Sequence, residues 1–310
     1  MQKIPCFDAH CDTVTYCLRT GHHLTGGGTE VSLDYAGRFS SYVQFFALYW
    51  NMGLPIDHSL REEFCRQRDW FCAELNAHPE LAVHCKGKED IRQAQAAGKA
   101  AAMLSIEDSS LLECDPANLE LAAEAGVQAI ALTWNYRNGV SGSCADCPDV
   151  GLSDRGRAFV KESERLGILM DVSHLSPKGF WDLFEMAERP IVASHSDAAA
   201  IHPHIRNLTD DQFRAIMESG GVVGLNYFAE FLDGTRDIPQ LIRHLEHFLD
   251  LGGEDHIGLG GDLDGCEEVC HGIDDLRGVP KFWAALEQRG YGETLLRKLF
   301  FDNWMRLVRA

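Results

Sequence analysis

Short runs of hydrophobic residues alternate along this chain with longer amphipathic segments. The short runs are nearly continuous, as in strands that are buried on both faces of a parallel sheet. The longer segments have the pattern of helices that cover such a sheet. The predicted strands are residues 6–10, 43–49, 101–107, 127–134, 168–174, 191–195, 222–227 and 257–262. The predicted helices include residues 60–76, 119–125, 154–166, 177–187, 210–219 and 239–251.

Eight buried strands that alternate with helices favour a closed (βα)₈ barrel of the TIM type. An open, doubly wound sheet is the alternative, but no Gly-x-Gly-x-x-Gly turn follows the first predicted strand. No linker rich in proline or charge divides the chain. We therefore expect residues 1–310 to form one domain, with helices from Lys281 onward packing on the barrel.

The composition is that of an ordinary globular protein, with 45% hydrophobic and 24% charged residues. A formal net charge of −19 argues against nucleic acids and anionic membrane surfaces as partners. The first residues show no secretory signal, and no hydrophobic run is long enough to span a bilayer. We therefore expect a cytoplasmic protein whose 11 cysteines are mostly reduced thiols.

Residues that can bind metals stand at the ends of five predicted strands, where barrel enzymes carry their active sites. Each one alone has an ordinary explanation, such as a helix cap, a core histidine or a turn. Together they offer enough nitrogen and oxygen ligands for two divalent metal ions. His10 and Asp12 are two positions apart, so we expect them to share one face of the first strand. The full set is His10, Asp12, Glu107, His174, His195 and Asp262.

At these residues the sequence resembles the membrane dipeptidase (renal dipeptidase) family of zinc metallopeptidases, within the amidohydrolase superfamily. The matching segments follow one another in order along nearly the whole chain. They are residues 7–12 (FDAHCD), 105–107 (SIE), 171–176 (DVSHLS), 193–196 (ASHS), 206–210 (RNLTD), 220–226 (GGVVGLN), 260–265 (GGDLDG) and 302–304 (DNW).

The resemblance implies a homodimeric enzyme that hydrolyses dipeptides, including those with a C-terminal D-residue, by means of two zinc ions. One zinc ion would be bound by His10 and Asp12 and the other by His174 and His195, with Glu107 bridging them. Asp262 would transfer the proton of the attacking water. Arg206 would bind the carboxylate of the substrate.

Trp134 departs from the family pattern, because members commonly have a histidine at this position, close to the scissile bond. An indole can donate one hydrogen bond but cannot accept one or carry a positive charge. We therefore expect Trp134 to affect the choice of substrate rather than the metal site. Asn135 and Tyr227 are expected to contact the substrate as well.

Two other functions remain open from the sequence. A deacetylase or lactonase of the same superfamily would often bridge its metals with a carboxylated lysine, but residues 127–134 contain none. A non-catalytic barrel that keeps its metals for structure would not need Asp262. Cys144 and Cys147, and likewise Cys266 and Cys270, could be free thiols, one local disulfide or a Cys₄ zinc site.

Overall fold

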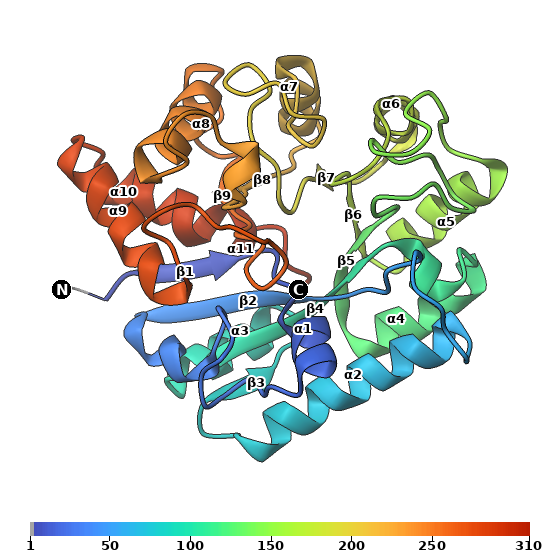
Figure 1. Ribbon diagram of the computed structural model, residues 1–310, viewed down its shortest axis with the longest axis horizontal. Coiled ribbons are helices and arrows are strands. Elements are labelled where there is room, and N and C mark those ends of the chain that lie inside the picture. The colour runs from blue at the N-terminus through green and yellow to red at the C-terminus, as the bar shows by residue number, and fades with distance from the viewer. Residues whose placement is uncertain (1–2) are drawn as a thin grey trace.

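The computed structural model describes residues 3–310, and its strands form a barrel of parallel strands with helices around it (Figure 1). The strand order is β7-β6-β5-β4-β2-β1-β9-β8, and β3 pairs with β4 outside this path. A bridge between Ala193 and Val223 joins the two end strands, so that the barrel is nearly closed. The strands are β1 (Pro5–Asp8), β2 (Ser41–Leu48), β3 (Ala82–His84), β4 (Ala100–Glu107), β5 (Val127–Ala131), β6 (Leu169–Asp171), β7 (Ile191–Val192), β8 (Val223–Leu225) and β9 (Ile257–Leu259).

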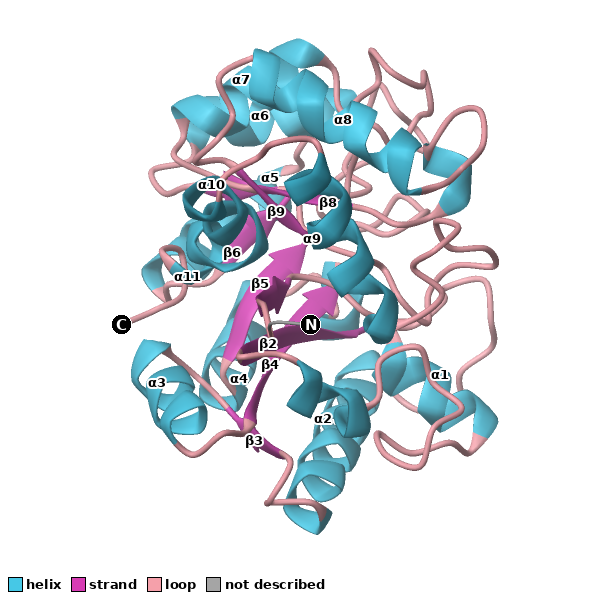
Figure 2. Ribbon diagram, turned by 90° about the vertical axis from the view of Figure 1, so that its left-hand side faces the viewer, coloured by secondary structure: helices cyan, strands magenta, loops and turns pink. Residues whose placement is uncertain are grey.

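The helices form the outer layer of the molecule, as the view in Figure 2 shows. Among residues 3–310, none of the helices combines the length and the hydrophobicity that a membrane span requires. The α-helices are α1 (Thr13–Thr20), α2 (Leu60–Ala77), α3 (Lys88–Ala96), α4 (Leu119–Ala125), α5 (Asp154–Arg165), α6 (Pro177–Met186), α7 (Asp210–Glu218), α8 (Ile238–Asp250), α9 (Val279–Gln288), α10 (Glu293–Arg297) and α11 (Asn303–Met305). A π-helical turn, Lys298–Asp302, joins α10 to α11.

The predicted (βα)₈ barrel is confirmed, and each of the eight predicted strands overlaps an observed one. The prediction missed β3, α1 and α3. β3 has only three residues, and one of them, Val83, is partly exposed, so it leaves no buried hydrophobic run. α3 buries only Ile91 and Ala94, so its hydrophobic pattern is weak, and α1 begins only a few residues after β1 ends.

Most observed strands end two or three residues before the predicted ends. β6 stops at Asp171 and β9 at Leu259, whereas the hydrophobic pattern continues to His174 and Asp262. His174 and Asp262 have φ angles of 67° and 58°, in the left-handed region that strands do not use. These residues therefore belong to the loops that follow the strands.

Side-chain caps begin several of the helices that separate the strands. Ser59 accepts a hydrogen bond from the N–H of Glu62, and the Glu62 side chain accepts one from Ser59 in return, which forms a capping box. Thr209 and Gln212 form the same motif at the start of α7. Such caps satisfy N–H groups that the first helical turn leaves unpaired, so these helices begin at defined residues.

The C-terminal helix α11 packs against the barrel beside β9. The indole N–H of Trp304 donates to the carbonyl of Leu259 over 2.9 Å, and Gly258 leaves the space that this ring needs. Asn303 Nδ2 donates to the carbonyls of Ile257 and Glu254. The matching segment at residues 302–304 thus contributes to the barrel itself.

We predict that Asn303→Ala lowers the free energy of unfolding by about 2 kcal/mol, because two carbonyls lose their donor and one of these bonds is buried. Chemical denaturation followed by circular dichroism measures this change. Gln93→Ala on the exposed face of α3 is the control and should change the value by no more than about 0.5 kcal/mol. Equal stability of both variants would show that the Asn303 contacts contribute nothing.

Candidate metal centre

The polar residues selected from the sequence gather at the carboxyl end of the barrel. A cavity of about 710 Å³ opens there. Its wall includes Asp12, Glu107, Trp134, Asn135, His174, Arg206 and Asp262. His10 and His195 are almost fully buried beside this wall, and their rings stack at a centroid distance of 3.8 Å.

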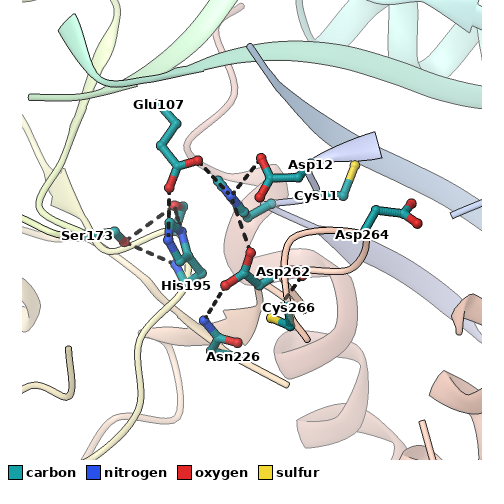
Figure 3. Close-up of polar contacts among 12 residues, drawn as sticks. Cys11, Asp12, Glu107, Ser173, His195, Asn226, Asp262, Asp264 and Cys266 are labelled. Atoms are coloured by element: carbon teal, nitrogen blue, oxygen red, sulfur yellow. Dashed lines mark hydrogen bonds and ion pairs between the residues drawn. The ribbon is translucent and has the colours of Figure 1, made fainter. Parts of the chain in front are cut away.

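Glu107, the last residue of β4, lies at the centre of the cluster. Its Oε2 is 3.6 Å from His10 Nε2, whereas its Oε1 is 2.9 Å from His174 Nε2 and 3.5 Å from His195 Nε2. The two oxygens of one buried carboxylate thus face two different sides of the cluster, as Figure 3 shows for Glu107. A carboxylate in this position can reach a cation on either side.

Asp12 and Asp262 also lie near Nε2 of His10. Their nearest oxygens are 4.0 Å and 3.7 Å from His10 Nε2. The expectation that His10 and Asp12 share a strand face is wrong, because β1 ends at Asp8 and Asp12 is the N-cap of α1. The Asp12 carboxylate makes no capping hydrogen bond, so the turn that begins α1 directs it to the cluster instead.

The buried polar atoms of the cluster fit a cation. His10 Nε2, Asp12 Oδ1 and Glu107 Oε2 are buried and have no hydrogen-bond partner among the described residues. Leaving such atoms unpaired is costly, and bound metal ions would give them partners. Groups of three possible ligands within 4.8 Å of one another are His10, Glu107 and His195, and His10, Asp12 and Asp262.

Burial controls the charges of these residues in the protein without metal. It lowers the pKa of His10 to about 3 and the pKa values of His174 and His195 well below their usual range, and Arg206 adds to each effect. Burial, followed by the neighbouring carboxylates, raises the pKa values of Asp12 and Glu107 well above theirs. A divalent cation favours neutral imidazole and ionised carboxylate, so it stabilises the charges that burial opposes.

A second layer of hydrogen bonds orients His195. Ser194 Oγ lies 2.7 Å from His195 Nδ1 and donates its own proton to Asp171 Oδ2. Asp171 Oδ1 also accepts from the backbone N–H groups of Ser173 and Ser194. Asp171 therefore connects the loops that follow β6 and β7, and these loops carry His174 and His195.

Asn226 holds Asp262 in place, and the sequence analysis assigned it no role. Its Oδ1 accepts from the N–H of Phe228 over 2.7 Å, so its Nδ2 must face Asp262 Oδ2, 3.0 Å away. Burial raises the pKa of Asp262 to about 6, and the bond from Asn226 acts in the opposite direction. A polar residue directly after the buried strand β8 was the signal in the sequence.

Asp264 is two residues from Asp262 but points away from the cluster (Figure 3). It accepts hydrogen bonds from Thr13 Oγ1 and from the N–H groups of Glu30 and Val31, at 2.6–3.1 Å. Its carboxylate therefore fixes the loop around Glu30, and only Asp262 faces the metal ligands.

Arg206 is buried beside the cluster, with an exposed fraction of 7%, and is not the surface arginine that its loop suggests. Its Nε is 3.1 Å from His174 Nδ1, and its Nη2 is 3.5 Å from the carbonyl of His195. The guanidinium lies 5.4 Å from the ring centre of Phe231. It is a cation placed directly at the cavity wall.

Trp134 and Asn135 line the same cavity from the loop that follows β5. The Trp134 ring lies between those of Tyr49 and Tyr136, at 5.5 and 5.9 Å, and is 6.3 Å from the His174 ring. Asn135 Oδ1 is 2.9 Å from His174 Nδ1, so Asn135 contacts a ligand residue as well as the cavity.

The expectation that Tyr227 contacts substrate is not supported by its position. The side chain is fully buried and is not part of the cavity wall, because the residue follows β8 toward the interior, beside Gly261 and Asp8. The 11 cysteines are all free thiols. No group of three metal ligands within residues 3–310 includes a cysteine, which argues against the Cys₄ site.

A (βα)₈ barrel with this ligand set at its carboxyl end defines the class of a metal-dependent hydrolase. The sequence matches the membrane dipeptidase family (peptidase family M19) over residues 1–310. The chain therefore belongs to this family and is a metallodipeptidase.

Related proteins agree with this assignment. A metallo peptidase from Rhodobacter sphaeroides, solved with a phosphinate mimic of the dipeptide L-Ala-D-Ala, is 30% identical, with a TM-score of 0.90 over 99% of both chains. A dipeptidase described as a metallo peptidase of family M19 is 32% identical, with a TM-score of 0.86 over 99% of this chain and 98% of its own. An uncharacterized Klebsiella pneumoniae protein, from the pqqA 5′ region, is 37% identical over 73% of this chain and 87% of its own.

Proposed function

We propose that this protein uses two zinc ions to hydrolyse the peptide bond of dipeptides. The observation that carries the proposal is Glu107, whose two oxygens face His10 on one side and His174 and His195 on the other. His10 and Asp12 would hold one ion, His174 and His195 the other, and Glu107 would bridge them. A pair of divalent ions, when bound, polarises a carbonyl and makes a water molecule nucleophilic at neutral pH.

Asp262 is the residue that we assign to proton transfer. It faces the cluster, Asn226 fixes one of its oxygens, and the other oxygen lies 3.7 Å from His10 Nε2. A carboxylate in this position can take the proton of the attacking water and deliver it to the leaving amine. Asp264, with its three hydrogen bonds elsewhere, cannot do this.

Arg206 is the residue that we assign to the C-terminal carboxylate of the substrate. A guanidinium can bind a carboxylate through two parallel hydrogen bonds, which fixes the distance from that carboxylate to the metal ligands. This distance would admit one residue beyond the scissile bond. The proposal includes dipeptides with a C-terminal D-residue, because the Rhodobacter sphaeroides relative was solved with an L-Ala-D-Ala mimic.

The two rival functions are less well supported. A carboxylated lysine cannot bridge the metals from β5, whose residues are Val-Gln-Ala-Ile-Ala. A purely structural metal site would not need a further carboxylate held toward an open cavity, as Asp262 is. The homodimer and the cytoplasmic location expected from the sequence stay predictions.

One prediction of the proposed function concerns metal content. The purified protein should contain close to two zinc ions per chain, and Glu107→Gln should weaken both, because one residue serves both ions. Elemental analysis after dialysis against a chelator series measures this. Fully active enzyme with a single tightly bound metal ion per chain would contradict the binuclear site.

A second prediction separates catalysis from metal binding at Asp262. Asp262→Asn should retain both metal ions and lower kcat by roughly 10²–10⁴-fold, the usual contribution of a general acid or base. Asp264→Asn should lower kcat less, because its carboxylate supports a loop. Steady-state kinetics with metal-replete protein tests both variants, and near-normal turnover of Asp262→Asn would show that another residue moves the proton.

A third prediction tests the preference for dipeptides. Converting the substrate's C-terminal carboxylate to an amide should lower kcat/KM about 30-fold or more, because a buried charge would lose its partner. Arg206→Ala should cause a similar loss with the free dipeptide but little further loss with the amide. If the unaltered enzyme turned over both substrates equally, a broader amidohydrolase would be the better description.

A further inference from the structure

Nδ1 of His174 has two polar neighbours, one of which is a hydrogen-bond acceptor and the other a donor. His174 Nδ1 is 2.9 Å from Asn135 Oδ1 and 3.1 Å from Arg206 Nε. The carbonyl oxygen of Asn135 can only accept a hydrogen bond, and the guanidinium of Arg206 can only donate one. A neutral imidazole has one N–H and one lone pair, so Nδ1 can satisfy only one of these neighbours at a time.

Nδ1 of His174 bonds to Arg206 or to Asn135, depending on whether Nε2 of the same ring carries a proton or binds a metal ion. When Nε2 carries the proton, it can donate to Glu107 Oε1 over 2.9 Å, and Nδ1 can accept from Arg206. When the Nε2 lone pair binds a metal ion, the remaining proton is on Nδ1, and only Asn135 can accept it. The imidazole stays neutral in both tautomers, so the exchange needs no net uptake of a proton.

We propose that Asn135 is a positioning residue that selects the metal-binding tautomer of His174, and that this choice releases Arg206 Nε for the substrate. The inference rests on the proposed metal centre. It adds a role to the expected contact of Asn135 with the substrate, and it couples metal binding to the availability of the carboxylate-binding arginine.

The surroundings hold Asn135 in place for this role. The N–H of Trp134 donates to Asp108 Oδ2 over 3.1 Å, and Thr133 Oγ1 donates to the carbonyl of His174 over 3.3 Å. The loop that carries Asn135 is thus tied to the loop that carries His174. Preorganisation of this kind lets a hydrogen bond to a metal ligand affect metal affinity.

His195, the other histidine proposed for the same ion, has a comparable arrangement. Ser194 donates its proton to Asp171, so its oxygen is free to accept from His195 Nδ1. Both histidines therefore have an acceptor at Nδ1 that favours a free Nε2. Only His174 also has a competing donor, and that donor is Arg206.

Zinc affinity tests the role of Asn135 without any measurement of peptide hydrolysis. In competition with a chromophoric chelator, Asn135→Leu should weaken one of the two zinc-binding steps by roughly 10–100-fold. Asn135→Asp, which keeps an acceptor, should bind zinc at least as tightly as the unaltered protein. Asn51→Leu, the same substitution in the loop before α2, is the matched control and should leave both affinities unchanged.

Unchanged zinc affinity in Asn135→Leu would overturn the inference, as would an equal loss in Asn135→Asp, which would indicate packing alone. The proposed function fails separately, if the unaltered protein binds two zinc ions but does not cleave dipeptides. Circular dichroism of each metal-free variant shows whether it is folded.

Nuclear magnetic resonance of the unaltered protein gives a test that does not depend on a variant of Asn135. With ¹⁵N-labelled histidine, the His174 ring should show the Nε2–H tautomer without metal and the Nδ1–H tautomer with zinc. The Nε–H resonance of Arg206, assigned by its loss in Arg206→Ala, should shift on zinc addition. A His174 ring that has the Nδ1–H tautomer in both states would overturn the proposed exchange with Arg206.

Discussion

The burial of Glu107 among three histidines is the constraint on which the active end of this barrel depends. A carboxylate that is 3% exposed and next to Asp12 and Asp262 would be strongly disfavoured as an anion without a cation. The same burial disfavours the charged form of each histidine. Bound metal ions would offset the unfavourable burial of the carboxylate. The rest of the barrel must be stable enough to hold the cluster together.

Backbone geometry at the strand ends adds to the free-energy cost of burying these charged groups. His174 and Asp262 both adopt positive φ angles although neither is glycine, and such conformations cost on the order of 1–3 kcal/mol each. The fixed partners around them, Asp171 between two loops and Asn226 beside Asp262, hold these residues where a strand could not place them. Rigid support and a strained loop together direct the side chains into one cavity.

Much of the fold and of the metal cluster could be predicted because both depend on local patterns. Continuous hydrophobic runs are characteristic of strands buried on both faces, and (βα)₈ barrels place polar residues at one end of them. β3 escaped prediction because one of its three residues is partly exposed, and α3 because it buries only Ile91 and Ala94. Tyr227 was expected at the cavity because it follows a strand. The direction of its side chain depends instead on packing against Gly261.

The sequence by itself determined the eight strands, their order of alternation with helices, and the residue types that gather at the strand ends. The tertiary structure decided which atoms meet, because hydrogen bonds between loops far apart in sequence set those distances. It separated Asp262 from Asp264, placed Arg206 against His174, and brought Asn135 to the same nitrogen. A pattern along the chain cannot contain these choices, since each depends on the three-dimensional position of a partner 30 or more residues away.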